Sequence, residues 1–273
     1  MTSPSASSHL QRATWTDRLR FITAGLVLLA YWSVCSLVLL PLVNVVLLLR
    51  CQPRRRELGQ AVLKQMFRGV AGILRWFGVT EVSYHGFDRV KAHLGPVILA
   101  PNHPALWDAV FVLAEVDQAA CVLKASLMRN PLLTFGARAA GFVPNEPTHP
   151  MLRRCIELLR SGERILFFPE GTRTRPEHGR MNPLFGGLAI IARNSGAPIL
   201  PIIVQTSSRY LSKGWPIWRL PTEPIRIQLR VGELVTCGPK DDAQLFLDRL
   251  RQSYLDAGCG VSEVDRTSKF DLR

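Results

Sequence analysis

Apolar and polar positions divide the chain into two parts with different patterns. Residues 1–20 are polar and rich in Ser and Thr, a composition typical of a disordered segment. Residues 21–49 then contain no charged side chain. A helix of that length would measure about 43 Å, more than the roughly 30 Å of a bilayer's hydrocarbon core. The pattern predicts a membrane segment, and Pro41 and Asn44 within it leave two forms open, a tilted span or a kinked, re-entrant pair of half-helices.

Arginines flank this apolar segment on both sides, and they are denser after it, at Arg50 and residues 54–56. Because cytoplasmic flanks carry the excess of Lys and Arg, the asymmetry predicts that the rest of the chain lies on the cytoplasmic side of the membrane. A cleaved signal peptide fits less well, since the apolar run is too long and no small-x-small cleavage site follows it.

Residues 57–77 show the spacing of an amphipathic helix, with basic residues away from the apolar side. Such a helix can lie in the membrane interface, or it can pack on the core of its own domain, and the pattern leaves both open. We interpret residues 21–78 as membrane-associated helices. The apolar positions of the second helix are Val62, Met66, Val70, Ile73, Leu74 and Phe77.

From residue 80 onward, short apolar runs alternate with helical patterns. This alternation predicts an α/β domain over residues 79–273, with a mixed, largely parallel sheet flanked by helices. In such sheets the chemistry lies just beyond the carboxyl ends of the strands. The expected strands cover residues 97–100, 120–123, 164–168, 199–204 and 225–231, and the expected helices cover residues 105–115, 131–140, 150–160, 184–194 and 241–254.

Charge and composition narrow the class of protein. The chain has 34 Lys and Arg against 21 Asp and Glu, a formal net charge of +13, and 47% of its residues are hydrophobic. A basic surface suits nucleic acid, an anionic membrane or an acidic substrate. No zinc-finger, helix-turn-helix or RNP-like pattern is present, so we expect a membrane lipid and an acidic co-substrate as partners, and no nucleic acid.

The cysteines and most histidines carry no metal or disulfide signature. The six cysteines are scattered without a CxxC pair, which favours reduced, buried thiols and a reducing compartment. The histidines at 85, 93, 149 and 178 lack metal-like spacing. We therefore expect no metal and no cofactor.

The first motif with chemical potential is the run Asn102-His-Pro-Ala-Leu-Trp-Asp108, directly after the expected strand at 97–100. General-base catalysis needs an imidazole held in one tautomer by a carboxylate on its other ring nitrogen. His103 and Asp108 can supply that pair if the turn between them folds back. An unrelated surface histidine and a helix-terminal aspartate would give the same spacing, so this motif alone is weakly specific.

The second motif is Phe168-Pro-Glu-Gly-Thr-Arg173, again directly after an apolar strand. Gly171 permits close backbone approach, and the Arg173 guanidinium suits a phosphate or carboxylate. Read alone, the motif is also explained by a charged turn closed by a salt bridge. The two motifs together are far more specific than either one.

With both motifs, the chain resembles the glycerolipid acyltransferases typified by 1-acylglycerol-3-phosphate acyltransferase. The NHxxxxD block of that family matches residues 102–108, and its FPEGTR block matches residues 168–173 residue for residue. A Pro-containing apolar strand at 198–204 also fits. The likeness covers roughly residues 80–210, and the membrane-associated helices of the family match residues 21–77 in kind.

The resemblance implies roles for individual residues. His103 is the general base that deprotonates the acceptor hydroxyl, and Asp108 orients it. The hydroxyl then attacks the thioester of acyl-CoA or acyl-carrier protein, which is a co-substrate rather than a cofactor, with no acyl-enzyme. The residues expected to bind substrate are Asn102, Lys124, Glu170, Gly171, Thr172 and Arg173. A solvated lysine at a strand end explains Lys124 equally well.

One block departs from the family. Members that act on lysophosphatidate usually carry an arginine after a Gly-aromatic-apolar strand, and here the block reads Gly141-Phe-Val-Pro-Asn-Glu146. A phosphate-binding partner for Arg173 is therefore missing, unless Arg153, Arg154 or Lys124 replaces it. An acceptor other than lysophosphatidate stays possible on this reading.

Three functions are open from the sequence. The first is transfer of an acyl group to a lysophospholipid, with 1-acylglycerol-3-phosphate foremost. The second is an acyltransferase of a specialised lipid or polyene pathway with another acceptor. The third, a non-enzymatic membrane scaffold that binds lipid or carrier protein, does not need His103, Asp108, Glu170 or Arg173. Oligomeric state cannot be predicted.

Overall fold

A mixed sheet forms the centre of the computed structural model, which describes residues 15–47, 52–216, 220–221 and 223–261. Its strands lie in the order β1-β7-β6-β2-β5-β3-β4, with β8 beside β6. Within the described residues, β6 and β7 form the one antiparallel pair, so the predicted mixed, largely parallel sheet is confirmed. The strands are β1 (Thr80–His85), β2 (Ile98–Pro101), β3 (Ala119–Leu123), β4 (Val143–Pro144), β5 (Arg164–Leu166), β6 (Ile199–Thr206), β7 (Ile225–Val231) and β8 (Gly260–Val261).

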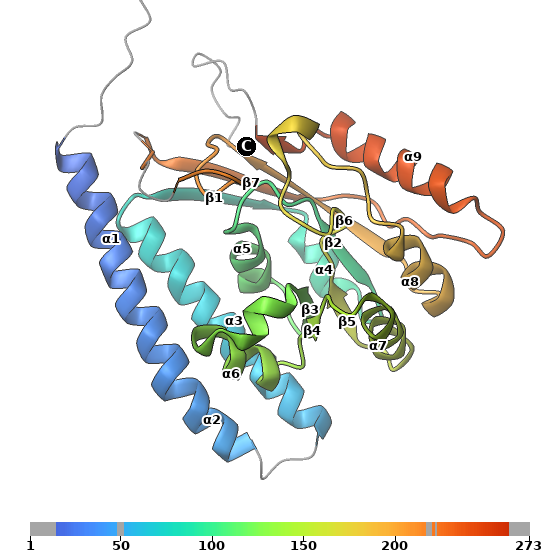
Figure 1. Ribbon diagram of the computed structural model, residues 1–273, viewed down its shortest axis with the longest axis horizontal. Helices are drawn as coiled ribbons and strands as arrows, with labels where there is room; N and C mark the ends of the chain where they lie inside the picture. Colours follow the sequence, from blue (N-terminus) through green and yellow to red (C-terminus); the bar gives the residue numbers. More distant parts are fainter. Residues whose placement is uncertain (1–14, 48–51, 217–219, 222, 262–273) are drawn as a thin grey trace, which may run out of the picture.

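Helices cover both faces of the sheet (Figure 1). The side chains of each strand alternate between the two faces. Leu99 and Leu166 pack on the side of α1, α3 and α5, whereas Ile98 and Ile165 pack on the side of α7, α8 and α9. The helices are α1 (Trp15–Val34), α2 (Leu40–Leu47), α3 (Gln52–Trp76), α4 (Phe87–Ala92), α5 (Asp108–Glu115), α6 (Pro131–Ala139), α7 (Thr148–Arg160), α8 (Gly187–Ser195) and α9 (Ala243–Asp256).

The N-terminal apolar segment forms one continuous helical rod rather than two half-helices that turn back. A π-helical turn, η1 (Cys35–Leu39), joins α1 to α2. It lies directly before Pro41, which has no N–H to give to the helical ladder. The expectation of disorder over residues 1–20 is wrong for residues 15–20, which form the start of α1, because Trp15 and Leu19 share its apolar pattern. Residues 1–14 and 48–51 lie outside the described residues.

The second amphipathic helix, α3, packs on the domain rather than standing apart from it. Met66, Val70 and Leu74 are buried in the same core as the sheet. Phe67 stacks on Trp32 of α1 with ring centroids 5.7 Å apart. The structure therefore favours core packing of the two alternatives, and α1 and α3 lie side by side in Figure 1.

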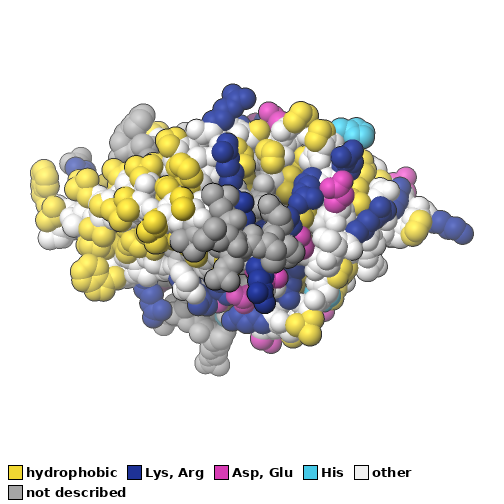
Figure 2. All heavy atoms as spheres, turned by 90° about the horizontal axis from the view of Figure 1, so that it is seen from below, with side chains coloured by type: hydrophobic (Ala, Val, Ile, Leu, Met, Phe, Trp, Pro, Cys, Tyr) yellow, Lys and Arg dark blue, Asp and Glu magenta, His cyan; other side chains and the backbone are white. Residues whose placement is uncertain are grey.

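The outer side of the N-terminal rod is apolar and exposed. The structure contains, among its described residues, one helical stretch long and apolar enough to cross a membrane, Trp15–Val45. Its inner side is tied to the domain, because Trp32 Nε1 donates to the carbonyl of Leu132 at 3.0 Å and Asn44 Nδ2 to that of Phe135 at 3.2 Å. Figure 2 shows hydrophobic side chains gathered over this end of the molecule.

Two glycines of α3 test the packing of this helix on α6. A Cβ on Gly59 would lie 2.4 Å from the carbonyl oxygen of Ala139, whereas a Cβ on Gly72 would meet nothing within 4 Å. Gly59→Ala must therefore push α3 and α6 apart, and we expect it to lower the unfolding temperature in detergent. Gly72→Ala lowers only the backbone conformational entropy that glycine loses when the helix folds. It should therefore stabilise the protein by roughly 0.5–1 kcal/mol. Equal effects of the two variants would contradict this packing.

Candidate active site

The two motifs meet at the carboxyl edge of the sheet. Asn102 and His103 follow β2 directly, and Glu170 follows β5 after a short turn. Because β2 and β5 are parallel neighbours, their carboxyl ends lie at the same edge. The short apolar strands thus bring residues about 65 positions apart into contact, as the backbone N–H of His103 donates to Glu170 Oε1 at 2.8 Å.

Asn102 extends the central ladder with its side chain. Its Nδ2 donates to the carbonyl of Val204 at 2.9 Å, and its Oδ1 accepts from the N–H of Val204 at 2.6 Å. The residue is fully buried. This pairing holds the start of the loop that carries His103, residues 102–107, against β6. Asn102 thus positions that loop. The substrate contact expected from the motif would require these bonds to break.

His103 and Asp108 form a hydrogen-bonded pair. Nδ1 of His103 and Oδ2 of Asp108 are 3.0 Å apart. The same Oδ2 accepts from the backbone N–H of Ala105 at 2.8 Å, which closes the turn between the two residues. Asp108 is the first residue of α5, where the helix dipole favours a negative charge. The carboxylate holds Nδ1, so Nε2 is the ring nitrogen left to exchange a proton.

Burial shapes both members of this pair. Asp108 is 1% exposed, and this burial raises the pKa of its carboxyl, while the hydrogen bond to His103 opposes the rise. The His103 ring stacks on Phe168 with centroids 4.0 Å apart and 25° between the planes. Phe168 thus packs against one face of the imidazole. This contact gives the first residue of the second motif a role beside His103.

Glu170 joins the two motif loops through both of its oxygens. Oε1 accepts from His103 as described, and Oε2 accepts from the backbone N–H of Asn182 at 2.8 Å. The Thr174 hydroxyl donates to both oxygens, at 3.0 and 2.8 Å. Desolvation raises the pKa of this carboxyl, and these donors counteract it. With both oxygens engaged inside the protein, Glu170 is placed to hold the loops, and its expected contact with the acceptor stays a prediction.

Asn182 is a site residue that the sequence reasoning missed. Its side chain donates to the carbonyl of Arg173 at 3.2 Å and accepts from the N–H of Arg175 at 2.9 Å. Arg251 of α9 in turn donates to the carbonyl of Asn182 at 3.1 Å. A lone Asn in a loop gives no sequence signal, and its role depends on a helix about 70 residues further on.

Arg173 bonds to the chain itself. Its Nη1 donates to the carbonyl of Leu211 at 2.8 Å, and the N–H of Leu106 donates to that same carbonyl at 3.2 Å. Leu211 has φ +62°, a region that non-glycine residues rarely adopt. Arg173 therefore connects the loop after β6 to the loop that carries His103. Its positive charge also counteracts the rise in the pKa of Asp108.

The remaining expected residues are less closely engaged. Gly171 adopts φ +66° in the turn after Glu170, a conformation that suits glycine, and Thr172 is half-buried beside it. Lys124 directly follows β3, which lies two strands away from β2 in the sheet order. Asn145, which lies in the block where the family arginine is expected, accepts from the N–H of Ala125 through Oδ1 at 2.9 Å. Asn145 thus fixes the turn that begins at Lys124.

The described residues contain no group of three His, Cys, Asp or Glu side chains that could hold a metal ion. Their cysteines are free and buried: Cys35, Cys121, Cys155, Cys237 and Cys259. Cys51 lies outside the described residues.

Fold and site together define an α/β protein with a histidine–carboxylate pair suited to general-base chemistry. Residues 81–205 match the model of the acyltransferase family. Over these residues the chain thus matches an acyltransferase domain, and the family resemblance inferred from the two motifs is confirmed.

Relatives with curated names agree with this assignment. The chain is 27% identical over 139 residues to the chloroplastic 1-acyl-sn-glycerol-3-phosphate acyltransferase BAT2 of Brassica napus, which covers 49% of this chain and 40% of that protein. It is 26% identical over 159 residues to 1-acyl-sn-glycerol-3-phosphate acyltransferase of Pseudomonas aeruginosa, which covers 55% of this chain and 59% of that protein. The matches thus span about half of these relatives' own length.

A solved structure shares the fold. The crystal structure of the 1-acyl-sn-glycerophosphate acyltransferase of Thermotoga maritima aligns with a TM-score of 0.66 at 21% identity. The alignment covers 88% of this chain and 99% of that one. At this identity the likeness concerns the fold.

Asp108→Asn separates the catalytic use of the carboxylate from its contribution to stability. An amide oxygen at the Oδ2 position still accepts both hydrogen bonds, but the negative charge that stabilises an imidazolium is lost. We expect activity to fall by at least about a hundredfold. Because burial raises the pKa of Asp108, its ionised form costs folding free energy. Relative to the variant, the wild type should lose stability as pH rises from ~4 through that raised pKa.

Thermal unfolding of both proteins in detergent between pH 4 and 8 measures this difference. Asp88→Asn is the matched control, because Asp88 also lies in the first turn of a helix, α4, but is exposed. A constant stability deficit of Asp108→Asn at every pH would contradict the assigned cost of burial.

Glu170→Gln is expected to lower the stability of the protein. Both Glu170 oxygens accept from backbone N–H groups, so the amide NH₂ must face the donor of either His103 or Asn182. An unsatisfied buried donor costs about 1–3 kcal/mol, and the unfolding temperature should fall by several degrees. The exposed Glu157→Gln of α7 is the control. Unchanged stability of Glu170→Gln would show that the carboxylate does not hold the two loops.

Proposed function

We propose that this chain transfers a fatty acyl group from acyl-CoA or acyl-carrier protein to the hydroxyl of a lysophospholipid, 1-acylglycerol-3-phosphate. The observation that supports it is the His103–Asp108 pair, with Nδ1 and Oδ2 3.0 Å apart, at the carboxyl edge of the sheet. The acyltransferase domain over residues 81–205 supports the reaction class, and the names of the two relatives support the acceptor.

The proposed reaction is a direct displacement. Nε2 of His103 accepts the proton of the acceptor hydroxyl while the oxygen attacks the thioester carbonyl carbon. The C–S bond then breaks, the ester is formed, and the leaving thiolate takes the proton back from the imidazolium. Asp108 stabilises the imidazolium in between, and Phe168 and the Glu170 bonds keep the ring and its backbone in place.

No covalent acyl-enzyme is required in this proposal. The sequence contains no G-x-S-x-G nucleophile motif. The buried thiols are poor nucleophiles as well, because burial raises the pKa of Cys121 and Cys155 to about 12 and only the thiolate attacks readily.

The chain is proposed to attach to a membrane through the outer side of α1 and α2. The exposed apolar side chains of this rod, such as Leu26, Leu29 and Val38, would otherwise contact water. The arginine-rich start of α3 supports a cytoplasmic position for the domain. Attachment along one side suits the geometry, because the other side of the rod is bound to α3 and α6.

A second acceptor class is favoured by one observation. Pro144-Asn-Glu146 stands where the basic residue is expected, and the Asn145 side chain in it accepts from the N–H of Ala125. An acyltransferase of a specialised lipid or polyene pathway, with an acceptor other than lysophosphatidate, would not need the arginine.

The test uses detergent-purified wild type and His103→Ala with labelled acyl-CoA and acyl-carrier protein as donors. Each donor is offered to lysophosphatidate and to a panel of other lysolipids and hydroxyl lipids. We expect transfer to lysophosphatidate by the wild type and a loss of about a hundredfold or more in His103→Ala. His149→Ala, an exposed histidine of α7, is the matched control and should retain activity.

The other outcomes discriminate between the alternatives. His103-dependent transfer only to a different acceptor would support the specialised pathway. Absence of His103-dependent transfer to every acceptor, from protein that unfolds cooperatively, would refute the acyltransferase proposal and favour a lipid-binding scaffold.

A further inference from the structure

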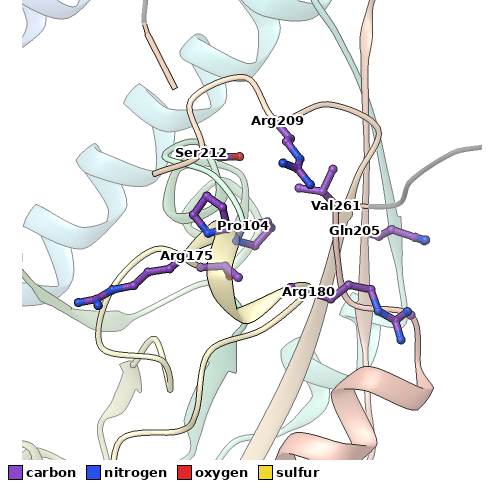
Figure 3. Close-up of a pocket in the computed structure, with 11 residues that line it drawn as sticks. Pro104, Arg175, Arg180, Gln205, Arg209, Ser212 and Val261 are labelled. Atoms are coloured by element: carbon purple, nitrogen blue, oxygen red, sulfur yellow. The ribbon is translucent and has the colours of Figure 1, made fainter. Parts of the chain in front are cut away.

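A pocket of about 520 Å³ opens beside the catalytic loop. Pro104, which follows the catalytic histidine, and Thr174, which bonds Glu170, form its inner wall. Gly258 and Val261, which follow α9, line its far side. The pocket thus lies beside the segment that follows α9, at the carboxyl end of β6 (Figure 3).

The charged residues that line the pocket are all basic. Arg175, Arg180 and Arg209 line it, and no Asp or Glu is among its described lining residues. In Figure 3 the Arg209 side chain extends into the pocket beside Val261, whereas the side chains of Arg175 and Arg180 extend outward on either side of it. A guanidinium carries a permanent charge and several N–H donors, which suit the oxygens of a phosphate group.

The position of Arg209 is set by the catalytic loop itself. Arg209 lies two residues before Leu211, whose carbonyl is held by Arg173 at 2.8 Å and by Leu106 at 3.2 Å. Its own carbonyl accepts from the N–H of Ser212 at 2.9 Å. A turn anchored in this way holds the backbone of Arg209 close to the loop that carries His103.

Arg180 is held from the opposite wall. A Cβ on Gly260 would lie 2.4 Å from the carbonyl oxygen of Arg180, and Gly260 adopts φ +91°. The backbone of β8 therefore passes directly against that of Arg180, an approach that requires glycine. This packing places Arg180 on the rim of the pocket.

A further polar group in the pocket lacks a partner. The Ser212 hydroxyl is a buried side-chain oxygen to which the described residues offer no hydrogen bond, and Ser212 lines the same pocket. In Figure 3 its oxygen lies on the side that faces Arg209. A buried hydroxyl without a partner costs free energy, and a turn of the Ser212 side chain toward the pocket would let it bond a ligand held there.

We propose that this pocket binds the phosphate group of a substrate, with Arg209 as the ligand and Arg180 as a second positive charge at the rim. The inference rests on the proposed acyl transfer and extends it, because both substrates of that reaction carry a phosphate: the glycerol phosphate of the acceptor and the phosphopantetheine of the donor. It also resolves the missing arginine of the second block, since basic residues outside both motifs supply the charge and Arg173 holds the loop that carries Arg209.

The first experiment measures binding without turnover. The full chain in detergent is titrated calorimetrically with glycerol 3-phosphate and with 4′-phosphopantetheine, each paired with its phosphate-free counterpart, glycerol or pantetheine. We expect one or both phosphate compounds to bind and the counterparts to bind much more weakly. Arg209→Gln should weaken that binding by about tenfold, and Arg180→Gln should weaken it in the same direction.

The matched control is Arg249→Gln, which removes the same charge from an exposed position of α9 that does not line the pocket. It should bind both compounds as the wild type does. Selective loss of glycerol 3-phosphate binding in Arg209→Gln would identify the acceptor as the source of the phosphate, and selective loss of phosphopantetheine binding would identify the donor. Either result supports the pocket.

Steady-state kinetics provide the second readout. KM for the phosphate-bearing substrate identified by titration should rise about tenfold in Arg209→Gln and stay unchanged in Arg249→Gln. Unchanged affinity and KM for both substrates in Arg209→Gln and Arg180→Gln would overturn the inference while leaving His103-dependent transfer intact. Arg209-dependent phosphate binding without any transfer would instead refute the proposed function and preserve the pocket.

Discussion

The buried carboxylate of Glu170 is the interaction on which the arrangement of the site depends. Two loops leave the carboxyl edge of the sheet from different strands, one after β2 and one after β5. Glu170 accepts from a backbone N–H of each loop, on His103 and on Asn182. Thr174 strengthens the connection, since its own N–H donates to the carbonyl of His103 at 2.8 Å. One carboxylate thereby sets the distance between His103 and the loop after β5, which borders the basic pocket.

This connection also explains why the FPEGTR motif contains more than ligand-binding groups. In this chain Phe168 stacks on the imidazole of His103, and Glu170 accepts from the backbone N–H of the same residue. Arg173 holds the loop after β6 by donating to the carbonyl of Leu211. Each contact acts on a different segment that is remote in sequence. The motif therefore acts mainly as a scaffold for the active site, and the charges that face the pocket come from residues outside it.

Much of the fold could be predicted from the chain because its strands are short, buried and apolar. The strands β2 and β5 were found by their apolar runs, and both precede a motif. The strand β1 and helix α4 were missed, since Thr80–His85 mixes polar and apolar residues at the edge of the sheet. The helix expected from residue 105 begins instead at Asp108, because residues 105–107 form the turn that brings its carboxylate back to the imidazole.

The site itself was predictable only as far as the motifs extend. His103, Asp108 and Glu170 were singled out by spacing, and the structure brings them together. Asn182 and Leu211 have no pattern around them, because their roles come from hydrogen bonds to segments far away in the chain. The same holds for Arg209, whose place beside the pocket follows from the anchored turn that contains its backbone.

The His103–Asp108 pair lies between an apolar surface and a basic pocket. The helices on one face of the sheet lead to an exposed apolar rod, and the carboxyl end of β6 borders a pocket with three arginines. An acyl transfer has to bring together an apolar chain and a charged, hydrated phosphate, and neither is stable in the environment that suits the other. In the proposed reaction, the loop that carries His103 at the sheet edge would let both groups reach one histidine while each stays in favourable surroundings.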